Sequence, residues 1–224
     1  WAADSSVGTV QIDDATGALV DGTRDDNAYT GCVGQYTWTA NSTAYYSDGY
    51  GSYICRHQYA GAPQTNWINT GCTGSEGQVS ALYATDDYVY YMCMFGGRLG
   101  RVDLAGTNNI QDFGNSGGSP QSYAYRLTAD ANWVYATGSD RITRYPIDGG
   151  SMDPGWYISS GDVRGVAVDS EHIYWSTSSG HYIRRANLDG TGVDSTWLDI
   201  GGQYGSVWGV TVTGSSVYWM TRSP

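Results

Sequence analysis

The stretch Gly165–Gly192 reads GVAVDSEHIYWSTSSGHYIRRANLDGTG, and it decides the fold. It contains three short apolar and aromatic runs, at Val166–Val168, Ile173–Trp175 and Tyr182–Leu188, which are separated by turns of polar residues and glycine. Short runs of this composition that alternate with such turns are typical of antiparallel strands. The stretch therefore predicts three consecutive antiparallel strands, and the architecture depends on whether the pattern recurs.

The same pattern recurs along the whole chain. A tyrosine in the second run marks each copy, at intervals of 45, 45, 39 and 44 residues, and these residues are Tyr45, Tyr90, Tyr135, Tyr174 and Tyr218. Repeats of this length with several strands each are the signature of propeller blades. A first strand is expected before each tyrosine, at Tyr36–Ala40, Ser80–Ala84, Tyr125–Ala129, Gly165–Asp169 and Gly209–Thr213.

Third and fourth strands complete the repeat. Third strands are expected to close on turns that contain glycine, at Ala105-Gly106, Asp148-Gly149 and Asp189-Gly190. Fourth strands are expected near Trp67, Ile110, Trp156 and Trp197, where the tryptophans are expected to pack between blades.

The two ends of the chain are expected to share one blade. Val7–Gly17 resembles a third strand with its turn and Ala18–Asp21 a fourth strand, with no strand expected before them, while Gly209–Met220 supplies only a first and a second strand. We therefore predict an all-β fold, a five-bladed β-propeller of four-stranded antiparallel blades in a single domain of residues 1–224. The N- and C-terminal strands would close it, which protects the strand edges.

The segment His172–Gly192 resembles a YWTD repeat of the low-density lipoprotein receptor class, and it is also similar to the repeats of bacterial propellers. The matching quartets are YYSD at 45–48, YYMC at 90–93, YATG at 135–138, YWST at 174–177 and YWMT at 218–221. This resemblance implies a propeller along nearly the whole chain and a binding function, and it implies no active site. The receptor propellers have six blades, whereas this sequence shows five.

Composition and charge restrict the partners. The chain has 22 acidic residues against 11 basic ones and a net charge of -11. Because phosphate binding requires a basic surface, this balance argues against nucleic acid as a partner. No apolar run reaches transmembrane length. No signal peptide is visible, so we expect that the leader of a secreted protein has been removed.

The cysteines indicate an oxidising compartment. Cys32, Cys55, Cys72 and Cys93 have spacings that fit neither a CxxC motif nor a zinc site. Three disulfide pairings are open. Cys32 and Cys72 both follow Thr-Gly just after an expected outer strand, which favours the pairs Cys32–Cys72 and Cys55–Cys93. We therefore expect a secreted protein, extracellular or periplasmic.

The loops that lead into the first strands are expected to share one face with the turns between second and third strands. Their mixture of aromatic and polar residues suits a sugar, because aromatic rings stack on C–H patches while polar groups exchange hydrogen bonds with hydroxyls. The candidate ligand-binding residues are Tyr36, Tyr50, Tyr123, Asp162, Arg164, His181 and Trp208.

Arg164 has two interpretations. It lies in the sequence GDVRGV immediately before a first strand, where it could bind a carboxylate or a sulfate of a ligand. Alternatively it forms an ion pair with Asp162 or another acidic residue, and the abundance of carboxylates in this chain favours the ion pair.

Metal and catalytic sites have little support. The loop Asp21–Asn27 is the best calcium candidate, but the sequence has no Asp-x-Asp-x-Asp-Gly loop and we expect no cofactor. The pair Asp86-Asp87 is expected to match Asp130 and Asp169 as turn residues. We therefore expect no metal ligands and no catalytic residues.

The sequence leaves several functions open. We expect a secreted, lectin-like binding module for a glycan or an extracellular protein, and the sequence favours a function without catalysis. A structural or assembly subunit of an extracellular layer or filament, with self-association, is the first alternative. The second is a polysaccharide hydrolase or lyase, because five-bladed propellers include glycosidases that use paired carboxylates.

Overall fold

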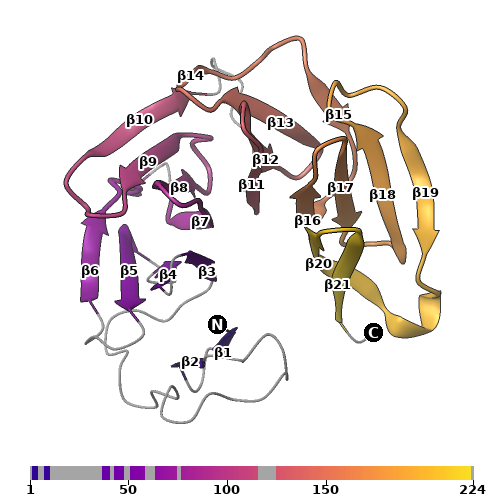
Figure 1. Ribbon diagram of the computed structural model, residues 1–224, viewed down its shortest axis with the longest axis horizontal. Coiled ribbons are helices and arrows are strands. Elements are labelled where there is room, and N and C mark those ends of the chain that lie inside the picture. Colours follow the sequence, from indigo (N-terminus) through magenta and orange to yellow (C-terminus); the bar gives the residue numbers. More distant parts are fainter. Residues whose placement is uncertain are drawn as a thin grey trace. The chain divides into compact units, whose positions relative to one another are not determined.

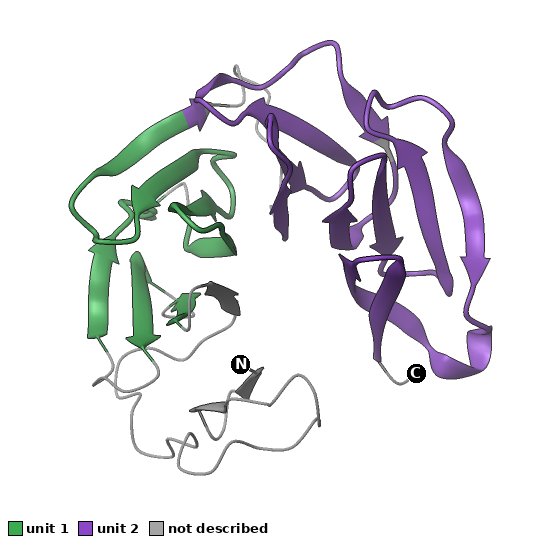
Figure 2. Ribbon diagram, viewed as in Figure 1, with its two compact units in different colours: residues 1–113 green, residues 114–224 purple. Residues whose placement is uncertain are grey.

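The structure is a computed structural model that describes residues 2–4, 8–10, 37–40, 43–47, 51–58, 64–74, 77–115 and 125–222. The chain divides into two compact units, residues 1–113 and residues 114–224 (Figure 2). Within the described ranges the regular structure is almost entirely strand, with a short 3-10 turn at Gly202–Tyr204. Across those same ranges, no helix is long and apolar enough to cross a membrane.

Unit 1 contains two sets of four consecutive antiparallel strands, besides a short N-terminal pair (Figure 1). The first is formed by β3 (Thr37–Ala40), β4 (Thr43–Ser47), β5 (Tyr53–Gln58) and β6 (Gln64–Asn69). The second is formed by β7 (Val79–Ala84), β8 (Tyr88–Cys93), β9 (Leu99–Asp103) and β10 (Asn109–Asn115). The last two residues of β10 belong to unit 2, where they pair in parallel with β14 (Gly150–Ser151).

Unit 2 repeats this plan (Figure 1). Its first sheet is formed by β11 (Leu127–Ala129), β12 (Trp133–Thr137), β13 (Arg141–Pro146) and β15 (Tyr157–Ser159). Its second sheet is formed by β16 (Val163–Val168), β17 (His172–Thr177), β18 (Tyr182–Asn187) and β19 (Asp194–Asp199). A third sheet has two strands, β20 (Ser206–Thr213) and β21 (Ser216–Arg222). The first strand β16 contacts both β11 and β20.

These strands confirm the sequence repeat. Every expected first strand overlaps an observed one, and each four-stranded set pairs in sequence order. The expected turn glycines Gly106, Gly149 and Gly190 have φ values of 82°, 97° and 87°, a conformation that glycine adopts without a steric penalty. The short strand β14 was not expected.

The N-terminal segment differs from the prediction. A strand, β1 (Ala2–Asp4), precedes β2 (Gly8–Val10) and pairs with it in antiparallel fashion, so the expectation that no strand comes before Val7 was wrong. A strand of three residues is too short to produce a recognisable alternation of apolar and polar residues. The expected fourth strand at Ala18–Asp21 lies outside the described residues.

Each four-stranded set contains the same stack of three side chains. A second-strand tyrosine lies opposite a third-strand arginine, in the pairs Tyr45–Arg56, Tyr90–Arg101, Tyr135–Arg144 and Tyr174–Arg185. The tyrosine and the arginine both pack on an aromatic ring of the fourth strand, Trp67, Phe113 or Trp197, or on Trp156, which directly precedes β15. Trp156 also donates a hydrogen bond to the Leu188 carbonyl of the next sheet (3.1 Å), which confirms its predicted role in packing between blades.

The first turn of each four-stranded sheet of unit 2 is held by an aspartate. Asp130 accepts hydrogen bonds from two backbone N–H groups of its turn and from the Tyr135 hydroxyl. Asp169 does the same with the Tyr174 hydroxyl. Burial opposes ionisation of Asp169, but these hydrogen bonds together hold its pKa below the usual value. The predicted turn role of both aspartates is confirmed.

The turn between β7 and β8 in unit 1 has a threonine at this position. The residue that corresponds to Asp130 is Thr85, whose hydroxyl accepts hydrogen bonds from the backbone N–H groups of Asp87 and Tyr88. The prediction matched Asp86-Asp87 with Asp130 and Asp169, and this match was wrong by one to two residues. A threonine hydroxyl can replace the carboxylate as the hydrogen-bond acceptor of the turn. The prediction considered acidic residues alone and therefore did not identify Thr85.

Candidate functional site

Four of the seven candidate ligand-binding residues are described, and all four lie at one end of the unit 2 sheets. Asp162 and Arg164 are at the start of β16, His181 lies in the turn from β17 to β18, and Trp208 is in β20. We refer to this end, formed by residues 160–164, 178–181 and 201–208, as the entry end of unit 2.

Backbone hydrogen bonds hold the entry end together. The Ser178 N–H donates to the Asp162 carbonyl (2.9 Å), and the Val207 N–H donates to the Gly180 carbonyl (3.3 Å). These bonds join the start of β16, the turn after β17 and the start of β20. Loop residues at this end therefore have fixed positions relative to each other.

A β-bulge directs two of the candidate side chains. Across β16 and β17 the paired residues change from Val163–Thr177 to Gly165–Ser176, which leaves Arg164 as the extra residue. Trp208 is the extra residue of the same bulge in β20. Bulges turn a side chain out of the regular alternation of a strand, and they are common beside binding sites.

The Arg164 guanidinium lies between two aromatic rings. Its Cζ atom is 4.1 Å from the ring centre of Tyr125 and 4.8 Å from that of Trp208. Its Nε donates to Oδ2 of Asp162 (3.0 Å), and its Nη2 donates to the same oxygen. The Trp208 ring is itself oriented by a hydrogen bond from its Nε1 to the Ser206 hydroxyl (3.0 Å). Below, Arg164, Asp162, Tyr125 and Trp208 are the Arg164 stack.

The Arg164 stack is partly open to solvent. The Arg164 and Asp162 side chains are 22% and 29% exposed, so the ion pair is neither fully buried nor fully hydrated. The second carboxylate oxygen of Asp162, Oδ1, is buried and has no hydrogen-bond partner in the described part of the chain. The favoured interpretation of Arg164 as the ion-pair partner of Asp162 is therefore confirmed.

Tyr125 was not among the candidate residues, although the repeat identifies it. Tyr125, Arg164 and Trp208 are separated by 39 and 44 residues, the same intervals that separate Tyr135, Tyr174 and Tyr218. The three residues thus occupy one repeat position, in β16 for Arg164, in β20 for Trp208 and just before β11 for Tyr125, and in space they form one column. Comparison of this position across the repeats would have identified Tyr125.

His181 lies at the entry end but has other contacts. Its Nε2 is 3.6 Å from Oδ1 of Asp199, and its ring centre is 4.3 Å from that of Tyr182. No contact between His181 and the Arg164 stack is found among the described residues. Tyr204, in the 3-10 turn of the same end, is 59% exposed.

Three candidates and the calcium loop lie outside the described residues. They are Tyr36, Tyr50, Tyr123 and the loop Asp21–Asn27. Within the ranges that the structure describes, no three His, Cys, Asp or Glu side chains are grouped in a way that could hold a metal ion.

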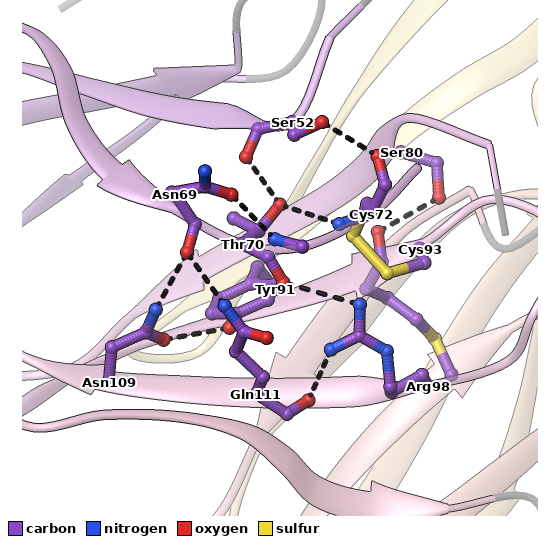
Figure 3. Close-up of a disulfide and its surroundings, with 12 residues drawn as sticks. Ser52, Asn69, Thr70, Cys72, Ser80, Tyr91, Cys93, Arg98, Asn109 and Gln111 are labelled. Atoms are coloured by element: carbon purple, nitrogen blue, oxygen red, sulfur yellow. Dashed lines mark hydrogen bonds between the residues drawn. A yellow bond between two sulfur atoms is a disulfide. The ribbon is translucent and has the colours of Figure 1, made fainter. Parts of the chain in front are cut away.

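The disulfide pairing differs from the favoured prediction. Cys72 is bonded to Cys93, with 5.3 Å between their Cα atoms, so both predicted pairs are wrong (Figure 3). Cys72 lies in the connection that leads into β7, while Cys93 ends β8 directly opposite Val79 at the start of β7. The pairing of β7 with β8 thus places Cys93 next to the residues that precede β7. Cys55 is also disulfide-bonded, and Cys32 lies outside the described residues.

Hydrogen bonds surround this disulfide (Figure 3). The Ser52 hydroxyl donates to the Cys72 carbonyl (3.0 Å), and the Ser80 hydroxyl donates to the Met92 carbonyl (3.3 Å). Ser80 is the extra residue of the β7 bulge, the position that Arg164 occupies in β16, and it is fully buried. At the corresponding bulge of unit 1, the structure therefore has a small buried hydroxyl in place of an arginine side chain.

Comparisons with known proteins show the fold. No family model and no curated protein matches the sequence. A chain in the crystal structure of a nidogen/laminin complex has a TM-score of 0.66 at 14% identity, with 95% of this chain and 80% of that chain covered. Streptogramin B lyase gives a TM-score of 0.68 at 11% identity, with 96% and 69% covered. BamB from Moraxella catarrhalis gives 0.58 at 16% identity, and this chain spans 65% of its length. These structures are β-propellers, and their likeness shows that the chain has a β-propeller fold.

Proposed function

We propose that the chain is a secreted, non-catalytic binding module whose Arg164 stack binds a glycan. The observation that carries the proposal is the position of the stack: one aromatic–arginine–aromatic column joins β16, β20 and the residues that lead into β11, at a partly exposed end. Two of its members, Arg164 and Trp208, are set in β-bulges that turn their side chains out of the strand alternation.

The chemistry of the stack suits a sugar. Rings at the edge of such a column offer apolar faces to the C–H groups of a pyranose, while guanidinium N–H groups donate to its oxygens. Exposed Tyr204 and the His181–Asp199 pair lie at the same end and add polar and aromatic contacts. The disulfide is consistent with a secreted protein, since such bonds persist in oxidising compartments.

Binding to an array of diverse glycans tests this function. Trp208→Ala should reduce the affinity for the bound glycan at least about tenfold, because stacking of a base or a sugar on one aromatic ring contributes on the order of 1–3 kcal/mol. The matched control is Tyr157→Ala, which removes another aromatic residue of unit 2 that is 57% exposed and contacts Arg141. That control should leave glycan binding unchanged.

A protein ligand is the second candidate, because the nidogen/laminin structure is a complex of proteins. If no glycan binds, and if the chain binds an extracellular protein that Trp208→Ala no longer binds, the Arg164 stack is a protein-binding site. If neither ligand class depends on Trp208, the proposed site is wrong.

We also propose that the chain forms one five-bladed propeller, with the Val7–Asp21 segment supplying the third and fourth strands beside β21. Tyr218 and Trp219 of β21 are 55% and 46% exposed, whereas the equivalent Tyr174 and Trp175 are 5% and 0% exposed. An apolar strand edge of this kind is normally covered, because uncovered edges aggregate. Coverage by a second copy of the chain is the alternative, and it corresponds to an assembly subunit.

Hydrogen exchange distinguishes the two forms of coverage. Val10→Pro in the full chain should accelerate exchange of the β21 amides, because proline cannot donate a ladder hydrogen bond. Protection that rises with protein concentration in the unaltered chain would instead support assembly. If the β21 amides of Val10→Pro are protected as well as those of the unaltered chain, at every protein concentration, closure by the Val7–Asp21 segment is contradicted.

A further inference from the structure

We infer that the Arg164 stack selects neutral sugars over acidic ones, with Asp162 as the residue that determines this specificity. The inference rests on the proposed glycan function and names its substrate class. An arginine in a sugar site would ordinarily suggest recognition of a carboxylate or sulfate. The geometry around Arg164 points to the opposite preference.

Asp162 already neutralises the guanidinium. Two of the three guanidinium nitrogens, Nε and Nη2, donate to Asp162 Oδ2. Within the described residues, Arg164 is the only cationic group that pairs with Asp162. A ligand carboxylate would have to approach Arg164 beside the Asp162 carboxylate, where like charges repel. The net charge of -11 adds to this repulsion at low salt.

The remaining nitrogen can still recognise a neutral ligand. Arg164 Nη1 has no partner among the described residues, and the side chain is 22% exposed. The guanidinium packs against the rings of Tyr125 and Trp208 and donates twice to Asp162, and these contacts orient Nη1. A fixed, charge-balanced N–H donor beside aromatic rings matches a hydroxyl or ring oxygen of a neutral pyranose.

Arg144 provides the internal reference. It also lies between two rings, Trp133 and Trp156, and its Nε and Nη2 also donate to one carboxylate oxygen, that of Asp153. Its third nitrogen, however, donates to the Leu188 carbonyl (3.3 Å). All three Arg144 nitrogens are therefore used inside the fold, whereas Arg164 keeps one for an external acceptor.

Calorimetric titration of the full chain with matched tetrasaccharides tests the inference. The probes are homotetramers of glucose and glucuronic acid, of galactose and galacturonic acid, and of mannose and mannuronic acid. The unaltered chain should bind the neutral member of its preferred pair at least about tenfold more tightly, the ratio that one charged hydrogen bond produces. Asp162→Asn frees the charge of Arg164, so the affinity for the acidic member should rise about tenfold.

Asp153→Asn is the matched control, because it breaks the corresponding ion pair of Arg144 and should leave the selectivity unchanged. Arg164→Gln is the second variant, and it should weaken binding of the neutral sugar about tenfold, through loss of the Nη1 donor. Thermal unfolding of each variant checks that it is folded.

The outcomes separate the two proposals. Tighter binding of an acidic tetrasaccharide by the unaltered chain overturns the selectivity and leaves the glycan function intact. A folded Asp162→Asn variant without any gain for the acidic sugar overturns the role of Asp162. Absence of binding to any tetrasaccharide and to the glycan array overturns the proposed function, and this inference with it.

Discussion

Two arginine stacks of unit 2 have nearly the same local chemistry in different places. In both, a guanidinium lies between two aromatic rings and donates twice to one aspartate oxygen. Arg144, with Asp153, Trp133 and Trp156, is on a third strand, and below these residues are the Arg144 stack. Arg164 is on a first strand, in a bulge.

The difference between the stacks is their place in the repeat. Third-strand arginines pack on fourth-strand rings in every four-stranded set, as Arg56, Arg101 and Arg185 also do. The Arg164 stack instead combines three unlike residues at one repeat position, where unit 1 has the buried Ser80. Recurrence thus indicates a structural role for the Arg144 stack, whereas departure from the repeat is the reason why we propose a ligand for the Arg164 stack.

The largest expected effect separates the stacks by stability. Trp156→Ala should lower the free energy of unfolding by about 3–5 kcal/mol, because it removes a large buried ring and leaves a cavity. Trp156 is 5% exposed and also donates a hydrogen bond to the Leu188 carbonyl. Trp208→Ala should cost roughly 1–2 kcal/mol, since its ring lies at a partly open end. Urea unfolding followed by tryptophan fluorescence and circular dichroism measures both.

Glycan affinity should show the reverse order. Trp208→Ala should lose binding while the chain stays folded, and any folded fraction of Trp156→Ala should keep it. Equal losses of stability in the two variants would mean that the Arg164 stack is structural like the Arg144 stack.

The sequence predicted the strands well because the repeat is local. Alternation, turn glycines and the spacing of the tyrosines are all properties of a few neighbouring residues, and each copy supports the others. The packing role of Trp156 and the turn role of Asp130 and Asp169 followed from the same register. Among the candidate site residues, the pairing of Arg164 with Asp162 was also predicted, since they are two residues apart.

Contacts between repeats were harder to predict. No sequence motif marks the column, because it joins three unlike side chains, Tyr125, Arg164 and Trp208. The bulge in β16, which a sequence pattern does not reveal, directs Arg164 into it. The prediction of the disulfide pairing failed for a related reason. The prediction matched Cys72 with a cysteine at the same repeat position, whereas disulfides form where Cα atoms approach, and here the approach is between an entry connection and the end of a second strand.

The disulfide gives a further stability prediction, smaller than that for Trp156→Ala, and it extends the comparison to unit 1. Replacing both Cys72 and Cys93 by alanine should lower the free energy of unfolding by about 3 kcal/mol, as expected for a crosslink across some twenty residues. Hydrogen exchange should accelerate in β7 and β8, next to the lost bond, while glycan binding at the Arg164 stack should not change.

Non-reducing peptide mapping of the unaltered chain should recover Cys72 linked to Cys93, and a peptide that joined Cys32 to Cys72 would contradict the structure. Loss of glycan binding in the folded double variant would show that this disulfide also supports ligand binding, and the contrast between the buried Ser80 and the partly exposed Arg164 would then no longer separate structure from function.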